Sequence, residues 1–132
     1  MSSVHVKTHF KNSFEGILET QHGNFNIGAD QDNLRPYDML SGALASCLYA
    51  TFLDIVSKKK LDFEKADIFI DGEKREEVPT WFSFIEIKTI IYLKEKGKEK
   101  AFEKSFELAT KYCSIYQTLS KVSEMKYSIE FK

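Results

Sequence analysis

The feature that most constrains this chain is a stretch without charge that runs from Met39 to Leu53. Pro36 can open a helix ahead of it, because the first turn of a helix needs no amide donor at that position. Lysines 58–60 then place cations at the negative end of the helix dipole. Apolar or small side chains would lie on all faces of this helix, namely Leu40, Ala43, Leu44, Cys47, Leu48, Ala50, Phe52 and Leu53. A helix that is apolar all round is buried, so the sequence predicts a buried central helix over residues 37–56.

The size of the chain bears on how that helix can be covered. A chain of 132 residues is one domain by length, so we expect a single domain over residues 1–132. A domain this small has little room to surround an apolar helix alone. We infer that a second subunit covers part of it.

Alternation of apolar and polar residues predicts strands on both sides of the central helix. The expected strands are residues 4–10, 14–20, 25–27, 66–71, 81–93 and 125–131, and two further helices are expected at 98–113 and 114–122. The order is therefore β-β-β-α-β-β-α-α-β. Because strands come in runs rather than in βαβ alternation, the fold class is α+β.

Composition excludes several partners and compartments. With 42% hydrophobic and 30% charged residues the chain is globular. A net charge of -1 gives no field to hold nucleic acid or an acidic membrane surface. His5, Lys7 and His9 interrupt any export signal, and no window approaches the roughly 20 apolar residues that span a bilayer. We expect a cytoplasmic protein with no membrane partner, whose thiols stay reduced unless chemistry oxidises them.

The only two cysteines, Cys47 and Cys113, each lie in an apolar, helix-forming setting. In a chain without an export signal, such thiols are redox-active, metal-binding or simply buried. Cys47 is either a packed thiol or a nucleophilic thiolate activated by a nearby cation or helix terminus. Arg35 is the nearest cation on the N-terminal side of it in the sequence. Asp38, in the first helical turn, either favours the helix dipole, orients an arginine or accepts a proton.

Cys113 lies on the apolar face of its expected helix, near the end. It is either a core residue or a resolving thiol that attacks an oxidised Cys47 and forms a disulfide. The spacing in the sequence leaves both interpretations open.

Metal and cofactor sites have little support in the sequence. His5, His9 and His22 have no ligand-like spacing relative to the thiols, and His5 and His9 share a strand face that we expect to be solvated. Neither a glycine-rich phosphate loop nor a Gly-x-Ser-x-Gly turn is present. We therefore expect no metal and no cofactor.

Taken together, the two cysteine segments resemble the OsmC/Ohr family of thiol-dependent peroxide-resistance proteins. The first segment is Pro36-x-Asp38-Met39-Leu40, followed by small residues and Ala45-Ser46-Cys47. The second is Lys111-Tyr112-Cys113-Ser114, followed by Thr118-Leu119. The charged run 72–77 ahead of Pro79 is similar to the hairpin of the broad OsmC-like branch.

This resemblance implies an OsmC-like fold, with antiparallel sheets wrapped around the central helix in an intertwined homodimer. It also implies that Cys47 attacks an organic hydroperoxide and becomes a sulfenic acid. Cys113 would then resolve it as a disulfide, and a dithiol reductant would restore both thiols. The implied catalytic set is Cys47, Cys113, Asp38 and Arg35.

The chain departs from the organic hydroperoxide resistance branch at two points. That branch activates its thiolate with an arginine from the N-terminal strand region, whereas this chain has no arginine before Arg35. Lys11 could substitute as a point charge but not as a planar fork. The branch also carries a glutamate directly after the helix-opening proline. Here that position is Tyr37, and the acid follows as Asp38. The pattern fits the broader OsmC-like branch better.

Three hypotheses follow. The first is a cysteine-based peroxidase in oxidative stress defence that acts on organic or fatty hydroperoxides. The second is a non-catalytic OsmC-like dimer that binds a small apolar ligand or senses oxidants. The third is a stable dimer whose cysteines are only core residues.

Overall fold

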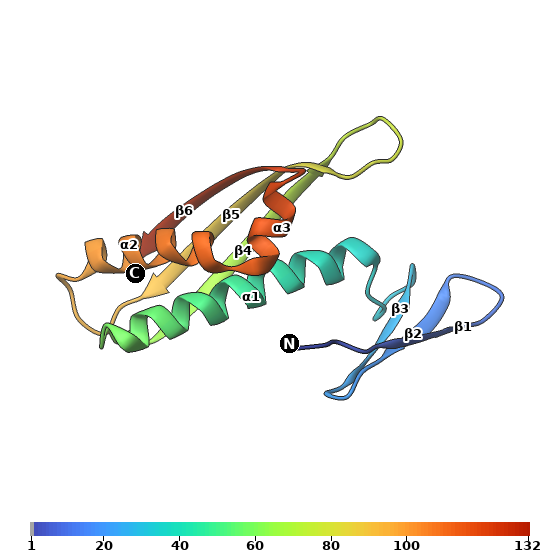
Figure 1. Ribbon diagram of the computed structural model, residues 1–132, viewed down its shortest axis with the longest axis horizontal. Helices are drawn as coiled ribbons and strands as arrows, with labels where there is room; N and C mark the ends of the chain where they lie inside the picture. Colours follow the sequence, from blue (N-terminus) through green and yellow to red (C-terminus); the bar gives the residue numbers. More distant parts are fainter. Residues whose placement is uncertain (1) are drawn as a thin grey trace. The chain divides into compact units, whose positions relative to one another are not determined.

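A computed structural model describes residues 2–132 as six strands and three helices (Figure 1). The elements are β1 (Lys7–Phe10), β2 (Glu15–Glu19), β3 (Asn24–Gly28), α1 (Pro36–Lys58), β4 (Lys65–Lys74), β5 (Phe82–Tyr92), α2 (Glu99–Tyr112), α3 (Ser114–Ser120) and β6 (Glu124–Phe131). This order is the one predicted, and the α+β class is confirmed. The chain divides into two compact units, one up to Leu40 and one from Ser41 to Lys132.

The first unit is an antiparallel sheet in the order β1-β2-β3. Cross-strand pairing places His9 opposite Ile17, and Ile17 opposite Asn26, so these three side chains share one face. The expected first strand was too long, because β1 begins only at Lys7. Val4 and Val6 do not form the buried face predicted for them and are 88% and 56% exposed.

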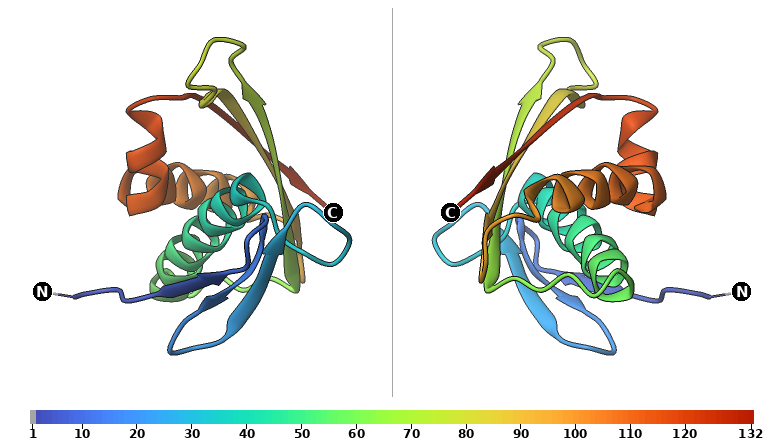
Figure 2. Two further views of the ribbon diagram at one scale, coloured as in Figure 1. Left: turned by 90° about the vertical axis from the view of Figure 1, so that its right-hand side faces the viewer. Right: turned by 90° about the vertical axis from the view of Figure 1, so that its left-hand side faces the viewer.

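The second unit holds a sheet in the order β4-β5-β6, with β5 in the centre. β4 pairs with β5 antiparallel, whereas β6 pairs with β5 parallel. The expectation of antiparallel sheets is therefore wrong for this pair. The reason lies in the connection between the two strands. Helices α2 and α3 bring the chain back to the end of the sheet where β5 begins, so β6 starts beside the first residues of β5 and runs in the same direction. Two further views show α1 and α2 on one face of this sheet (Figure 2).

The core of the second unit lies between that face and the two helices. Ile85, Ile87 and Ile91 alternate along β5 and are fully buried. Phe52 of α1 packs against two rings of α2, with centroids 6.4 Å from Phe102 and 5.7 Å from Phe106. Truncating an aromatic residue in such a cluster costs about 3–5 kcal/mol, so this cluster fixes where α1 and α2 lie on the sheet.

Helix α1 is buried along one stripe in the single chain. Leu44, Leu48, Phe52 and Val56 recur at every fourth position and are inaccessible to solvent. The other faces of α1 are not all covered in the single chain, since Leu53 on another face is 40% exposed. Burial on all sides therefore stays a prediction that requires a second subunit.

By length and composition alone α1 could cross a membrane, so the expectation that no window approaches a span is also wrong. Its buried stripe packs in the protein core, as in the core helix of a soluble protein. The same two criteria select core helices of this kind.

Candidate functional site

The fold brings Cys47 and Cys113 together within the second unit. Cys47 lies in the middle of α1 and is partly exposed. Cys113 lies between α2 and α3 and is fully buried. The two side chains interact, because each perturbs the pKa of the other. Neither thiol is in a disulfide.

Cys113 is held firmly because it ends one helix and begins the next. Its backbone N–H donates to the Ala109 carbonyl at 2.8 Å, and its own carbonyl accepts from the Gln117 N–H at 3.0 Å. Its Sγ accepts the Tyr116 N–H at 3.4 Å, in the role of an N-cap. Across the same junction the Gln117 side chain donates to the Thr110 carbonyl at 2.9 Å.

The surroundings of Cys47 favour its thiolate. Partial burial acts to raise its pKa, but hydrogen bonding outweighs this effect and the pKa of Cys47 lies below that of an ordinary thiol. The largest lowering contribution comes from the Ile115 backbone, followed by the Cys113 side chain and by Ser114 through its side chain and backbone. All of these groups belong to the α2–α3 junction or to the first turn of α3.

The pKa of Cys113 moves in the opposite direction. Burial raises it most, and hydrogen bonding with Cys47 together with the negative charge of that thiolate raises it further. The Tyr116 N–H acts against these effects but does not cancel them. The pair is therefore asymmetric: Cys47 is the group that ionises, and Cys113 is the neutral thiol that donates to it.

Such a pair can perform a defined chemistry. A partly exposed thiolate is a nucleophile toward peroxides and disulfides. A neutral thiol at its side can close a disulfide once the first sulfur has been oxidised.

Arg35 and Asp38 contact each other at the start of α1. The Arg35 backbone N–H donates to the Asp38 carboxylate at 3.0 Å, which is half of a capping box. The Arg35 guanidinium donates to the Ala29 carbonyl at 2.9 Å. Asp38 precedes Cys47 by nine residues on α1, about 13 Å along a helix axis, so it is not a neighbour of the thiol on that helix.

The donors that sequence reasoning missed are Ser114 and Ile115. Ile115 acts through its backbone, which every residue has and which carries no motif, and Ser114 acts through its side chain as well as its backbone. The available signal was the expected restart of a helix immediately after Cys113, because the first N–H groups of a helix have no partner within it.

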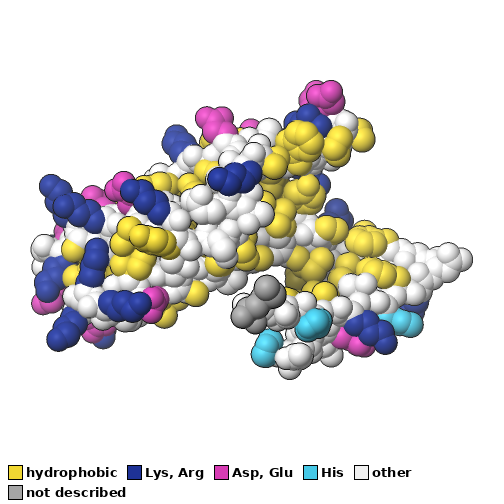
Figure 3. All heavy atoms as spheres, viewed as in Figure 1, with side chains coloured by type: hydrophobic (Ala, Val, Ile, Leu, Met, Phe, Trp, Pro, Cys, Tyr) yellow, Lys and Arg dark blue, Asp and Glu magenta, His cyan; other side chains and the backbone are white. Residues whose placement is uncertain are grey.

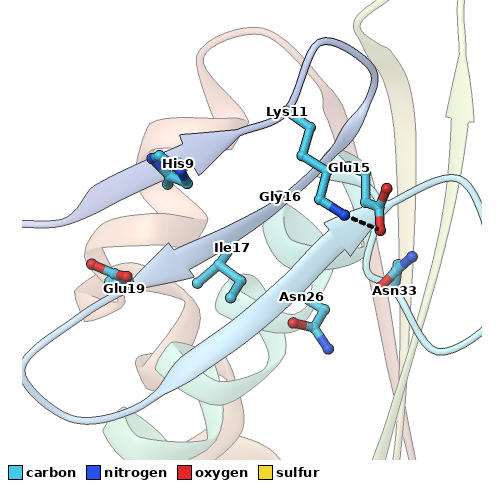
Figure 4. Close-up of a pocket in the computed structure, with 8 residues that line it drawn as sticks. All are labelled: His9, Lys11, Glu15, Gly16, Ile17, Glu19, Asn26 and Asn33. Carbon is cyan, nitrogen blue, oxygen red and sulfur yellow. Dashed lines mark hydrogen bonds and ion pairs between the residues drawn. The ribbon is translucent and has the colours of Figure 1, made fainter.

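Lys11, considered as a substitute for the missing arginine, forms an exposed ion pair with Glu15 at 3.5 Å. Both line a hollow of about 300 Å³ on the sheet of the first unit, together with His9, Gly16, Ile17, Glu19, Asn26 and Asn33 (Figure 4). His5 and His9 are exposed, so the prediction that these two histidines are solvated is confirmed, and His22 is exposed as well. Within residues 2–132, no group of three or more His, Cys, Asp or Glu side chains could hold a metal ion.

Comparison with known proteins gives the class of this chain. The model of the family described as OsmC-like protein matches residues 28–128. "Protein YhfA" of Escherichia coli K12 is 28% identical over 95 residues, which cover 72% of this chain and 71% of that protein. The chain therefore belongs to the OsmC-like family.

Solved structures agree with this assignment. A hypothetical protein from Aquifex aeolicus VF5 superposes with a TM-score of 0.90 at 28% identity, over 100% of this chain and 98% of that one. The organic hydroperoxide resistance protein OhrB of Bacillus subtilis superposes with a TM-score of 0.68 at 16% identity, over 99% and 98% of the two chains. At that identity the second likeness concerns the fold alone.

Proposed function

We propose that this protein is a cysteine-based hydroperoxide reductase in oxidative stress defence, with Cys47 as the peroxidatic residue and Cys113 as the resolving residue. The observation that carries the proposal is the asymmetry of the pair, in which the pKa of Cys47 is lowered and that of Cys113 is raised. The names of solved neighbours, organic hydroperoxide resistance proteins among them, support organic hydroperoxides as the substrate class. We place the protein in the cytoplasm, where reductants keep thiols available.

The reaction has three steps. The Cys47 thiolate attacks the terminal oxygen of ROOH, the O–O bond breaks, and the alcohol ROH leaves after taking a proton. Cys47 is now a sulfenic acid. Cys113 loses its proton and attacks the Cys47 sulfur, which releases water and forms the Cys47–Cys113 disulfide. A dithiol reductant then returns two electrons and restores both thiols.

In this proposal Arg35 and Asp38 support the site indirectly. Their described contacts stabilise the start of α1, the helix that carries Cys47. Their direct participation in the chemistry is a separate hypothesis, which substitution of Asp38 tests below.

The test is anaerobic thiol counting before and after one equivalent of cumene hydroperoxide. The reduced protein should lose both thiols, and mass analysis should link Cys47 to Cys113. A Cys113→Ser variant should still consume one equivalent and stop at the sulfenic acid of Cys47. A Cys47→Ser variant should consume none. If both thiols of the unsubstituted protein stay intact, the protein is not a hydroperoxide reductase that uses cumene hydroperoxide.

A second candidate function is a dimer that binds a small apolar ligand. A shallow hollow of about 300 Å³ runs between α1 and β4, lined by Gly42, Ala45, Ser46, Tyr49, Ala66 and Ile68. By helix geometry this hollow lies nearly opposite Cys47 around the axis of α1. Native mass spectrometry of freshly purified protein checks this candidate. A retained apolar molecule that Ala45→Arg displaces would support it.

A further inference from the structure

The two sulfurs differ in their access to an outside reagent. Cys113 is fully buried, and the hydrogen bonds at 2.8 Å to Ala109, 3.0 Å from Gln117 and 3.4 Å from Tyr116 hold it at the helix junction. Cys47 is partly exposed on the surface of α1. An entering thiolate must reach the sulfur it attacks in line with the S–S bond, so access decides which sulfur reacts.

We infer that the dithiol reductant attacks Cys47, so that the mixed disulfide forms on Cys47 and Cys113 is the leaving group. This inference rests on the proposed function, because the Cys47–Cys113 disulfide is a step of that cycle. It identifies the surface around Cys47 on α1 as the place where the reductant docks.

The first thiolate of the reductant bonds to Cys47 Sγ, the Sγ–Sγ bond breaks, and its electron pair leaves on Cys113, which takes a proton from water. The second thiol of the reductant loses its proton and attacks the reductant's own sulfur in the mixed disulfide. Cys47 then leaves as a thiolate. The dithiol is oxidised to a disulfide by two electrons, and the protein regains two thiols.

A second effect acts in the opposite direction and has to be weighed. A thiol with a lower pKa leaves faster, and this alone favours attack on Cys113 with Cys47 as the leaving group. With a Brønsted slope of about 0.5, each pKa unit changes the rate only about threefold. Attack on Cys113 also requires the α2–α3 junction to open and its hydrogen bonds to break, and each tenfold loss of reactive population through this opening offsets about two pKa units of leaving-group advantage. Access therefore outweighs the leaving-group effect.

The experiment starts from the Cys47–Cys113 disulfide made with diamide, so that it does not depend on hydroperoxide turnover. The oxidised protein is mixed with glutathione, quenched with acid at the earliest accessible times, digested at low pH and mapped by mass spectrometry. Glutathione should be found on Cys47, with Cys113 free, in at least tenfold excess over the reverse product. As a matched pair, Cys47 in Cys113→Ser should react with 5,5′-dithiobis(2-nitrobenzoate) at least tenfold faster than Cys113 in Cys47→Ser. In guanidinium the two rates should become equal.

The outcomes are distinguishable. Early glutathione on Cys113 overturns the inference and leaves the proposed peroxidase intact. If diamide produces no Cys47–Cys113 disulfide, the inference and the resolving role of Cys113 both fail. Equal reactivity of the two single thiols in the folded protein contradicts the difference in access on which the inference is built.

Discussion

At the scale of single residues, Cys47 and Cys113 are the same chemical group with pKa values that move apart. The thiolate of Cys47 is stabilised through hydrogen bonding with Ile115, Cys113 and Ser114, so no arginine is needed for its pKa to fall. The cost of burial falls mainly on Cys113, which stays neutral. This arrangement explains how the pKa of Cys47 can fall in a chain without an arginine before Arg35.

The first prediction concerns pH. The reactive form of Cys47 is the thiolate, so its alkylation rate should rise as pH increases through its pKa and then level off. Because that pKa is lowered, the half-maximum should lie at a lower pH than that of a free cysteine measured under the same conditions. Cys113→Ala removes one donor to the thiolate and should move the half-maximum to higher pH. Cys113→Ser keeps a donor and should move it less. Iodoacetamide kinetics from pH 5 to 10 measure this, and a lower midpoint in Cys113→Ala would refute the assigned donor.

The second prediction compares two buried hydroxyl groups, one without a hydrogen-bond partner and one with a partner. Thr89 on β5 is 2% exposed, and within residues 2–132 its hydroxyl oxygen has no hydrogen-bond partner. Ser123 is 6% exposed and donates to the Phe82 carbonyl at 2.6 Å. Thr89→Val should leave the free energy of unfolding unchanged or raise it by about 1 kcal/mol, whereas Ser123→Ala should lower it by about 1–3 kcal/mol. Urea titrations at constant m-value measure both. A loss above 1 kcal/mol in Thr89→Val would mean that this hydroxyl has a partner.

At the scale of elements, the start of α1 tests what Asp38 does. Its carboxylate accepts the Arg35 backbone N–H at 3.0 Å, so Asp38→Ala should destabilise the protein by about 1 kcal/mol. Asp38→Asn keeps an acceptor oxygen and should lose less. If Asp38 serves only the helix, Asp38→Asn should consume cumene hydroperoxide at the normal rate. Slow turnover with an unchanged melting temperature would instead give Asp38 a part in the chemistry.

The sequence predicted the order of the helices and strands correctly but not the direction of every strand. Periodicity predicted every element in order, because one buried face leaves a repeat of two or 3.6 residues in the sequence. It could not predict that β6 lies parallel to β5, since Met125, Tyr127 and Ile129 alternate in the same way in either direction. For the site, sequence identified both thiols. The Ile115 backbone and the side chain and backbone of Ser114 interact with Cys47 only because the fold brings the start of α3 to the middle of α1, and the sequence does not show this proximity.

At the scale of the whole molecule, the main question is what covers the remaining apolar surface. Hydrophobic side chains are visible at the surface of the single chain (Figure 3). In the first unit Phe10, Phe14 and Phe25 are 45%, 50% and 53% exposed. A unit of about 40 residues buries too little surface to be stable alone, so it needs a cover. We propose that a second copy of the chain supplies it, which is also the arrangement that the apolar α1 predicts.

The dimer can be tested on one face of α1. Leu53 is 40% exposed and lies by helix geometry on the same face as Gly42 and Tyr49, which line the hollow beside β4. Sedimentation equilibrium should give twice the chain mass of 15.3 kDa. Leu53→Glu should shift the protein toward 15.3 kDa, because a carboxylate buried in an apolar interface without a partner loses its hydration.

Val122→Glu is the matched control. It also replaces an aliphatic side chain by glutamate, at a residue that is 57% exposed and lies outside α1, and it should leave the mass unchanged. If the unsubstituted protein sediments as a single chain at micromolar concentration, the proposed dimer is wrong and α1 is stable with Leu53 exposed to solvent.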